Sequence, residues 1–251
     1  MKKYFKGFLM AVSMFTIIPL PHNIWDDEGG KHIMKFYPVV GLIVGFIWYG
    51  VYKVLQLLGA STMITAAIIM IVPFILTGML HLDGFMDVCD ALLSRRSKEE
   101  KLRILKDSHT GAFAVIALAM LFTVNFAAVY TVVDMNTNLL GLIFIPIISR
   151  SLIGYLLLSK EAMKGSSLGA FFKQGTGVVD RALLMMALIV ATFTAIVFVN
   201  VKVGIMVSVM IVTALLLVDN CCREFDGISG DTAGFGLVMA ETVGILILAL
   251  I

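Results

Sequence analysis

The chain has 251 residues, of which 60% are hydrophobic and only 14% charged, with a formal net charge of +2 and a mean hydropathy of +1.00. An average soluble domain is about 25% charged, and a soluble domain of this length could not bury so much apolar surface in one core. The composition excludes a soluble enzyme, a disordered chain and a free nucleic-acid-binding domain, and no nucleic acid partner is expected from so small a net charge. It predicts an all-α polytopic membrane protein, with the lipid bilayer as its surroundings.

The first apolar stretch, from Phe5 to Ile18, has Lys2, Lys3 and Lys6 at its start and ends in the run Pro19-Leu20-Pro21. A membrane-spanning helix needs about 20 apolar residues, so this stretch is short for a crossing. A signal peptide is an alternative, but no small-x-small cleavage site follows the apolar run. We expect a retained interfacial or re-entrant helix, and whether residues 5–18 cross the membrane stays open.

The remaining apolar stretches are long enough to cross the bilayer, and we predict seven crossings in a single membrane domain, residues 1–251. Only Glu241 interrupts the last of them with a charge. The predicted crossings lie near residues 36–58, 62–80, 111–133, 139–158, 182–200, 203–218 and 233–251.

The distribution of Lys and Arg predicts the orientation. Segment 81–110 carries six of these residues and segment 159–181 carries four, whereas the short segments that alternate with them carry only Lys202. By the positive-inside rule the two basic segments face the cytoplasm. Loop 219–232 falls on the same side, and so do the N-terminal lysines if the first stretch does not cross.

Three aspartates follow the predicted crossing 62–80. Asp83, Asp87 and Asp90 have offsets of four and three residues, which place them on one face of a helix. Their mutual repulsion is understandable if a divalent cation lies between them, and hard oxygen ligands suit Mg²⁺ or Mn²⁺. The alternative is a solvated acidic helix end. His81 adjoins this face and is expected to orient a carboxylate or a phosphate by a hydrogen bond.

A second polar segment, residues 106–111, precedes the next crossing. Lys106, Asp107 and Ser108 stand close to a glycine at a helix start, which suits a loop that holds phosphate. The alternative is an ordinary capped helix start, with Ser108 or Thr110 as the N-cap.

The remaining candidates lie late in the chain. Asp231 opens the last crossing, after Gly230, and Glu241 lies ten residues further on, inside an otherwise apolar helix. Arg150 is a single cation inside another crossing. Charges at this depth are costly in lipid, so these side chains are expected to face a polar cavity or one another. A structural pairing of Arg150 with Glu241 and a contact of Arg150 with an anionic substrate group both stay open.

The polar segments resemble the cobalamin synthase family, whose full name is adenosylcobinamide-GDP ribazoletransferase. The family pattern is roughly H-L-D-G-x-x-D-x-x-D-G, then K-D-S-x-x-G. The matching residues here are His81-Leu82-Asp83-Gly84-Phe85-Met86-Asp87-Val88-Cys89-Asp90, with Ala91 in place of the usual glycine, and Lys106-Asp107-Ser108-His109-Thr110-Gly111. Supporting matches run along nearly the whole length: Phe15 to Pro21, Tyr37-Pro38-Val39-Val40-Gly41, Arg150, Gly230-Asp231-Thr232 and Glu241.

The resemblance implies a Mg²⁺-dependent transferase at the cytoplasmic face of the cell membrane. Its substrates would be adenosylcobinamide-GDP and α-ribazole or α-ribazole 5′-phosphate, and its products adenosylcobalamin or its 5′-phosphate, and GMP. A second copy of the chain or other enzymes of the cobalamin pathway stay open as partners.

The resemblance and the spacing together predict the roles of the site residues. Catalytic roles fall to Asp83, Asp87, Asp90 and Asp231, the first three as metal ligands, with Asp90 or Asp231 as the base. The substrate-binding residues predicted are His81, Gly84, Lys106, Asp107, Ser108, Arg150, Gly230, Thr232 and Glu241. Lys106 and Arg150 would bind phosphate oxygens.

Two other functions compete with this one. A CDP-alcohol phosphotransferase also places aspartates at helical spacing beside a membrane, but its pattern has Ala-Arg where Met86 and Asp87 stand here. A transporter or channel would use Arg150 and Glu241 as intramembrane pathway residues. The acidic cluster, however, is predicted at the cytoplasmic ends of the crossings rather than at their middle.

Overall fold

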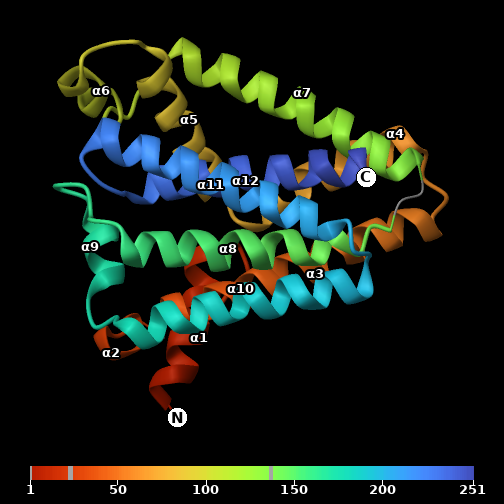
Figure 1. The fold of residues 1–251 in the computed structure, drawn as a ribbon, viewed down its shortest axis with the longest axis horizontal. Helices are drawn as coiled ribbons and strands as arrows, with labels where there is room; N and C mark the ends of the chain where they lie inside the picture. The colour runs from red at the N-terminus through yellow and green to blue at the C-terminus, as the bar shows by residue number, and fades with distance from the viewer. Residues whose placement is uncertain (1, 22–24, 136–137) are drawn as a thin grey trace.

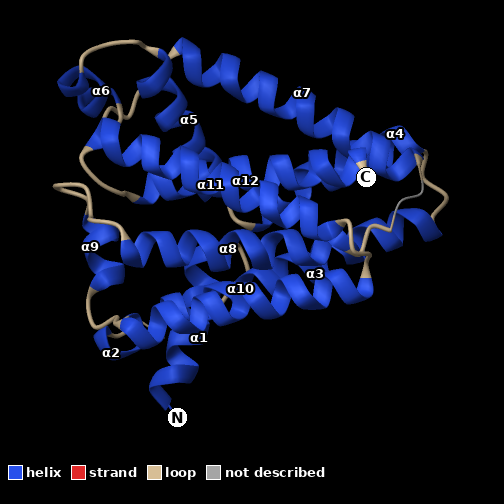
Figure 2. Cartoon of the chain, viewed as in Figure 1, coloured by secondary structure: helices blue, strands red, loops and turns tan. Residues whose placement is uncertain are grey.

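The computed structural model describes residues 2–21, 25–135 and 138–251, and Figure 2 shows helices joined by loops, without a strand, in this part of the chain. The helices, in chain order, are α1 (Lys2–Phe15), α2 (Asp27–Gly30), the 3₁₀ helix η2 (Ile33–Phe36), α3 (Tyr37–Leu57), α4 (Thr62–Leu76), α5 (Leu80–Leu93), α6 (Lys98–Ile104), α7 (Ala112–Asp134), α8 (Gly141–Ser159), α9 (Ser167–Lys173), α10 (Val178–Phe198), α11 (Val203–Phe225) and α12 (Gly230–Leu250). The predicted all-α class is confirmed.

Six helices are long and apolar enough to cross a membrane, and α4 with α5 forms a seventh candidate that is bent by 92°. The chain is therefore a multi-pass membrane protein. The bend corrects the predicted straight crossing 62–80, because α4 ends at Leu76. The break consists of Gly78 and Met79, both in the left-handed region with φ of 60° and 62°, which an α-helix cannot accommodate.

Helix α8 lies in the middle of the bundle (Figure 1), where 16 of its 19 residues are buried. It packs against α3, α10, α11 and α12. Gly41 and Gly45 of α3 make one of these contacts possible, since a Cβ on either would overlap the backbone of α8 at Pro146 or Ile143. Small residues that let two backbones approach are the usual means of packing helices in lipid.

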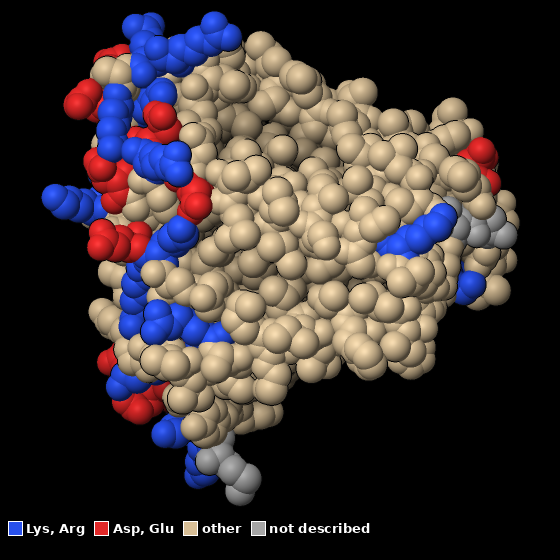
Figure 3. Space-filling view, in the orientation of Figure 1, with Lys and Arg blue, Asp and Glu red and all other residues tan. Residues whose placement is uncertain are grey.

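The charged side chains gather at one end of the molecule. Figure 3 shows Lys, Arg, Asp and Glu concentrated at the end where Figure 1 places α6 and α9, with few charges at the opposite end. The basic segments 81–110 and 159–181, loop 219–232 and the N-terminal lysines thus lie at one common end, as the charge pattern predicts. We refer to this end as the charged end.

Helix α1 is a short amphipathic helix of 14 residues. In Figure 1 it runs crosswise to the long helices near the charged end, as expected for a helix that does not cross the membrane. Its apolar face, which includes Met10 and Phe15, is buried against the bundle. Beyond α1, the backbone N–H of Ile17 donates a hydrogen bond to the carbonyl of Leu76 (2.9 Å), which ties the N-terminal segment to the break before α5.

Candidate active site

The site is built where α5 meets the first turn of α12. A Cβ on Gly84 would lie 2.7 Å from the Cα of Asp231, so only glycine allows this approach of the two helices. Gly234, one turn further along α12, faces the carbonyl of His81, which lies 3.2 Å from the position of a Cβ there. This close packing brings the aspartates of α5 beside Asp231, which is far away in sequence.

The first turn of α12 is held in place by its own cap. The Ser229 hydroxyl accepts a hydrogen bond from the Thr232 N–H (3.2 Å), and the Ser229 N–H donates to the Thr232 hydroxyl (2.8 Å). These reciprocal bonds satisfy backbone groups that a helix start otherwise leaves free. The Ser229 hydroxyl also donates to Asp231 Oδ2 (3.3 Å). Thr232 is buried and serves this cap, and it does not line the cavity described below, although it was predicted to bind substrate.

The loop before this cap is docked on a second loop at the charged end. Helix α11 ends at Phe225, its C-cap residue Asp226 has a left-handed φ of 56°, and Gly227 follows with a φ of 135°. The Ile228 N–H then donates to the carbonyl of Glu161 (2.8 Å), and the Met163 N–H donates to the carbonyl of Ile228 (2.9 Å). The start of α12 is thereby fixed to the segment between α8 and α9.

Four aspartates surround the junction of α5 and α12, but they do not all point the same way. Asp83 and Asp231 line a cavity, and Asp87 lies close enough to Asp83, Asp231 and Asp90 to be repelled by all three charges. Asp90 points to the start of α7, where its Oδ1 accepts from the Ala114 N–H (3.4 Å). None of the ion pairs found in the described part of the chain includes any of these four carboxylates.

The predicted metal ligands can be tested against these positions. Among the described residues, no three His, Cys, Asp or Glu side chains are grouped closely enough to hold a metal ion by themselves. Asp83, Asp87 and Asp90 therefore do not form a closed three-carboxylate site, and a magnesium role for them stays a prediction. The donor chemistry does fit Mg²⁺, which in proteins commonly takes one or two carboxylates together with substrate phosphates and water.

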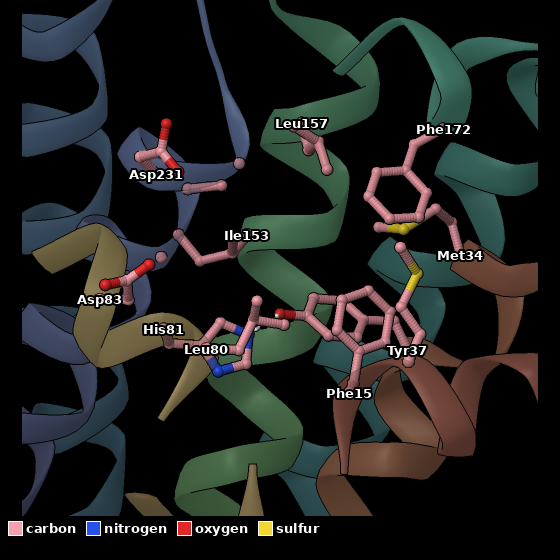
Figure 4. Close-up of a pocket in the computed structure, with 14 residues that line it drawn as sticks. Phe15, Met34, Tyr37, Leu80, His81, Asp83, Ile153, Leu157, Phe172 and Asp231 are labelled. Atoms are coloured by element: carbon pink, nitrogen blue, oxygen red, sulfur yellow. Dashed lines mark hydrogen bonds between the residues drawn. The ribbon is translucent and has the colours of Figure 1, made fainter. Parts of the chain in front are cut away.

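The cavity has a volume of about 280 Å³ and lies near the charged end between α1, η2, α3, α5, α8, α9 and α12. Figure 4 shows two unlike sides: Asp83 and Asp231 on one, and aromatic and sulfur-containing side chains on the other. Its lining residues are Met14, Phe15, Met34, Tyr37, Leu80, His81, Asp83, Ile153, Leu157, Phe172, Gly230, Asp231, Ala233 and Gly234. A small molecule with one apolar part and one part directed at carboxylates or a bound cation fits this arrangement.

His81 lies at the base of the cavity. Its Nε2 is 2.9 Å from the hydroxyl of Tyr37 on α3, and Figure 4 shows the two rings meeting between the acidic and the apolar sides. His81 was expected to orient a carboxylate or a phosphate, and the structure pairs it with Tyr37 instead. The Tyr37 hydroxyl and Nε2 satisfy each other, so this contact holds the base of the cavity together.

The segment 106–111 lies outside the cavity. Lys106, Asp107 and Ser108 are exposed at the charged end, and no side chain among them lines the cavity. Asp107 accepts from the side chain of His109 (2.7 Å) and from its backbone N–H (3.0 Å), and these bonds lower the pKa of the Asp107 carboxyl. The alternative of Ser108 or Thr110 as N-cap is wrong, because Gly111 occupies that position without a side-chain cap.

Gly111, the N-cap residue of α7, also makes room for Asp90. A Cβ at this position would overlap the carboxylate of Asp90, so glycine is what lets Asp90 reach the first turn of α7. The backbone N–H groups there favour a negative charge. The sequence motif contains this glycine, but only the fold shows which aspartate needs it.

Arg150 and Glu241 form a buried ion pair in the middle of the bundle. Arg150 Nη1 lies 2.7 Å from Glu241 Oε1, and the side chains are 1% and 10% exposed. The Ser149 hydroxyl donates to the same Glu241 oxygen (2.6 Å), and Arg150 Nη1 also lies 3.3 Å from the carbonyl of Pro146. The pairing left open by the sequence is present, and neither residue lines the cavity.

Several lining residues carry no signal of chemistry in the sequence. Phe15 and Tyr37 fall in stretches that match the family pattern, but their aromatic side chains could equally have been core residues. Phe172, on the short helix α9, had no signal at all. Its role follows only from the loop between α8 and α10, which folds back over the charged end.

The fold and the site define a polytopic helical membrane protein with an acidic, partly apolar cavity at its charged end. Comparison with known proteins gives the particular family. The sequence profile of the family described as Cobalamin-5-phosphate synthase matches residues 7–249. The chain therefore belongs to this family, as its motifs indicate.

Individual relatives agree with the family assignment. A protein of Clostridium botulinum (strain Alaska E43 / Type E3) named adenosylcobinamide-GDP ribazoletransferase is 50% identical over 248 residues, 98% of this chain and 97% of that protein. A protein of the same name from Clostridium perfringens (strain SM101 / Type A) is 48% identical over the full length of both chains. Another, from Clostridioides difficile (strain 630), is 31% identical over 98% of each. No solved structure gives a significant match to this chain.

Proposed function

We propose that this protein is an adenosylcobinamide-GDP ribazoletransferase, which joins the cobinamide phosphate of adenosylcobinamide-GDP to α-ribazole or α-ribazole 5′-phosphate. The observation that carries the proposal is identity of about one half over nearly the whole chain to proteins of that name. The cavity with Asp83 and Asp231 at the charged end supports it, because the reaction needs a base for the attacking hydroxyl and carboxylates that can hold a cation beside the pyrophosphate.

The reaction is a phosphoryl transfer with nucleoside monophosphate as leaving group. A ribose hydroxyl of the ribazole attacks the phosphorus that carries the cobinamide, a new oxygen–phosphorus bond forms, and the bond to the bridging oxygen of the pyrophosphate breaks to release GMP. The hydroxyl proton must go to a base. Asp231 and Asp83 both face the cavity, so one of them accepts the proton, whereas Asp90 is engaged with the start of α7.

The carboxylates have a second task in this reaction. One or two of Asp83, Asp87 and Asp231 would hold Mg²⁺ together with substrate phosphates and water, and the metal would supply neutralising charge for the pyrophosphate and the leaving GMP. Asp90 then keeps the end of α5 aligned with the start of α7. This replaces the predicted ligand set of three aspartates on α5 by one or two carboxylates, with Asp231 among the candidates because it lies at the junction with Gly84.

The charged end is proposed to face the cytoplasm of the cell, with the protein in the cell membrane. The two segments richest in Lys and Arg lie at this end, and such segments are retained on the cytoplasmic side. Labelling of a single cysteine placed at the charged end, in intact cells and in inverted vesicles, tests this orientation.

The direct test is GMP release by the purified protein in detergent. We expect release only when adenosylcobinamide-GDP, α-ribazole 5′-phosphate and Mg²⁺ are all present. A transporter or channel would give no chemistry under these conditions, which would refute the proposal. Release without the ribazole would instead indicate a hydrolase.

The same assay tests the carboxylates. Asp83→Asn and Asp231→Asn are each expected to lower kcat at least a hundredfold, a size typical of lost acid–base or metal-ligand groups. Asp134→Asn is the matched control, since Asp134 is an exposed carboxylate at the opposite end of α7 from Asp90. Full activity in both site variants would remove the assigned roles.

A further inference from the structure

The proposed reaction uses the acidic side of the cavity and leaves its apolar side without a role. That side is formed by Phe15 and Met14 of α1, Tyr37 of α3, Phe172 of α9 and Met34 of η2. Three separate segments of the chain converge on it, namely α1, the consecutive helices η2 and α3, and α9, and Figure 4 shows the aromatic rings facing the two aspartates across the cavity. A pre-formed small-molecule site is typically lined in this way, by apolar and aromatic side chains from several segments.

We propose that this apolar side binds the flat dimethylbenzimidazole base of the ribazole acceptor, so that its ribose lies against Asp83 and Asp231. The inference rests on the proposed function and deepens it, because it assigns the acceptor, and not the corrinoid or the guanosine, to the cavity. The bound benzimidazole then fixes the position of the attacking ribose hydroxyl relative to the carboxylates. Holding the reacting groups in this orientation raises the rate of the transfer.

The size of the cavity excludes the corrinoid. Small-molecule pockets are usually about 300–1,000 Å³, and this one, at about 280 Å³, is at the lower limit. It holds a base with part of a sugar, whereas a corrin macrocycle with its amide side chains needs far more space. The corrinoid must therefore lie outside, with only its phosphate directed inward.

The apolar side of the cavity suits a benzimidazole better than guanine. A guanine edge carries several hydrogen-bond donors and acceptors, which cost free energy if they are buried without partners. At the base of the cavity, His81 Nε2 and the Tyr37 hydroxyl bond to each other (2.9 Å), whereas His81 Nδ1 is buried without a hydrogen-bond partner. A benzimidazole with two methyl groups presents mainly apolar edges and so loses little on entering.

The aromatic side chains pack on one another and form a wall against which a flat ring can lie. Phe15 lies 5.9 Å from Phe172 and 4.4 Å from Tyr37, measured between ring centroids. Aromatic groups pack on one another in offset and edge contacts at such distances. Met14 and Met34 complete the wall, and their flexible thioether chains adapt to the outline of a bound base. Helix α1 thereby becomes a part of the acceptor site.

The test is binding of radiolabelled α-ribazole to the detergent-purified protein, without the second substrate. Phe172→Leu and Phe15→Leu are each expected to raise the Kd about tenfold, which corresponds to the loss of one aromatic contact. Phe193→Leu is the matched control, because Phe193 is 68% exposed on α10, away from the cavity, and its variant should bind as the unchanged protein does.

A second measurement keeps the test valid if a variant is partly misfolded. The ratio of kcat/KM for α-ribazole to that for a purine riboside does not depend on the fraction of active protein. We expect this ratio to fall about tenfold in Phe172→Leu, with an unchanged KM for adenosylcobinamide-GDP.

The outcomes separate this inference from the proposed function. If the unchanged protein releases GMP but both variants keep the Kd and the base preference, the cavity does not hold the acceptor base and the inference fails. A rise in the KM for adenosylcobinamide-GDP alone would also overturn it, in favour of the donor. If the unchanged protein transfers nothing, it is the proposed function that fails.

Discussion

The buried pair of Arg150 and Glu241 allows a structural role to be separated from a role in substrate binding. Glu241→Ala would leave an almost fully buried guanidinium without its carboxylate, 2.7 Å away in the structure. Removing one partner of a buried pair lowers the free energy of unfolding by about 3–5 kcal/mol. Replacing both by apolar residues of similar volume, as in Arg150→Met with Glu241→Leu, is expected to restore most of this stability, because no buried charge is left alone.

The surroundings of the pair support this expectation. The Ser149 hydroxyl, which donates to Glu241, also lies 3.2 Å from the carbonyl of Pro146 and keeps that partner after the exchange. In the double variant, the buried polar groups that remain around the pair therefore still have a hydrogen-bond partner.

The assay combines unfolding and turnover. The unfolding midpoint in a denaturant titration should fall strongly in Glu241→Ala and recover in the double variant, which should also release GMP with an unchanged KM for adenosylcobinamide-GDP. A double variant that is as stable as the unchanged protein but has a KM for this substrate raised tenfold or more would refute the reasoning. Arg150 would then contact the substrate phosphate, as was first considered.

Three further predictions concern the site. Gly84→Ala should lower kcat at least tenfold, because its Cβ would push α5 away from Asp231. Gly50→Ala is the control and should keep full activity, since a Cβ there meets nothing within 4 Å. Equal activity of the two variants would contradict the packing argument. Gly111→Ala should reduce turnover by displacing Asp90, while the Kd for α-ribazole stays the same. A changed Kd would contradict the view that Asp90 lies outside the acceptor site. Removal of divalent cations with EDTA should abolish GMP release and added Mg²⁺ should restore it; turnover that persists in EDTA would exclude the proposed metal.

Much of this protein could be predicted from local sequence pattern. Uncharged runs of about 20 residues define membrane helices by length alone, and the alternation of basic and non-basic loops assigns their ends. The spacing of Asp83, Asp87 and Asp90 places them on one side of α5, and the motifs around them identify the family. Each of these conclusions depends on neighbours in the chain, so no knowledge of helix packing is needed.

The bend after α4 shows where the local pattern stops. The hydropathy of residues 62–80 is continuous, but Gly78 and Met79 adopt left-handed conformations that turn the chain by 92°. Leu76 also accepts a hydrogen bond from Ile17, a partner from the N-terminal segment. A contact of that kind has no periodic signature in the sequence.

The tertiary structure alone decided which helices meet. In lipid most faces of a crossing helix are apolar, so hydrophobic periodicity does not reveal which side turns to which neighbour. Contacts at single glycines set this instead: Gly84 brings Asp231 beside Asp83, and Gly111 admits Asp90 to α7. The sequence by itself determined the class, the helices and the acidic residues, whereas close packing between distant segments determined the cavity, its aromatic side and the pairing of Arg150 with Glu241.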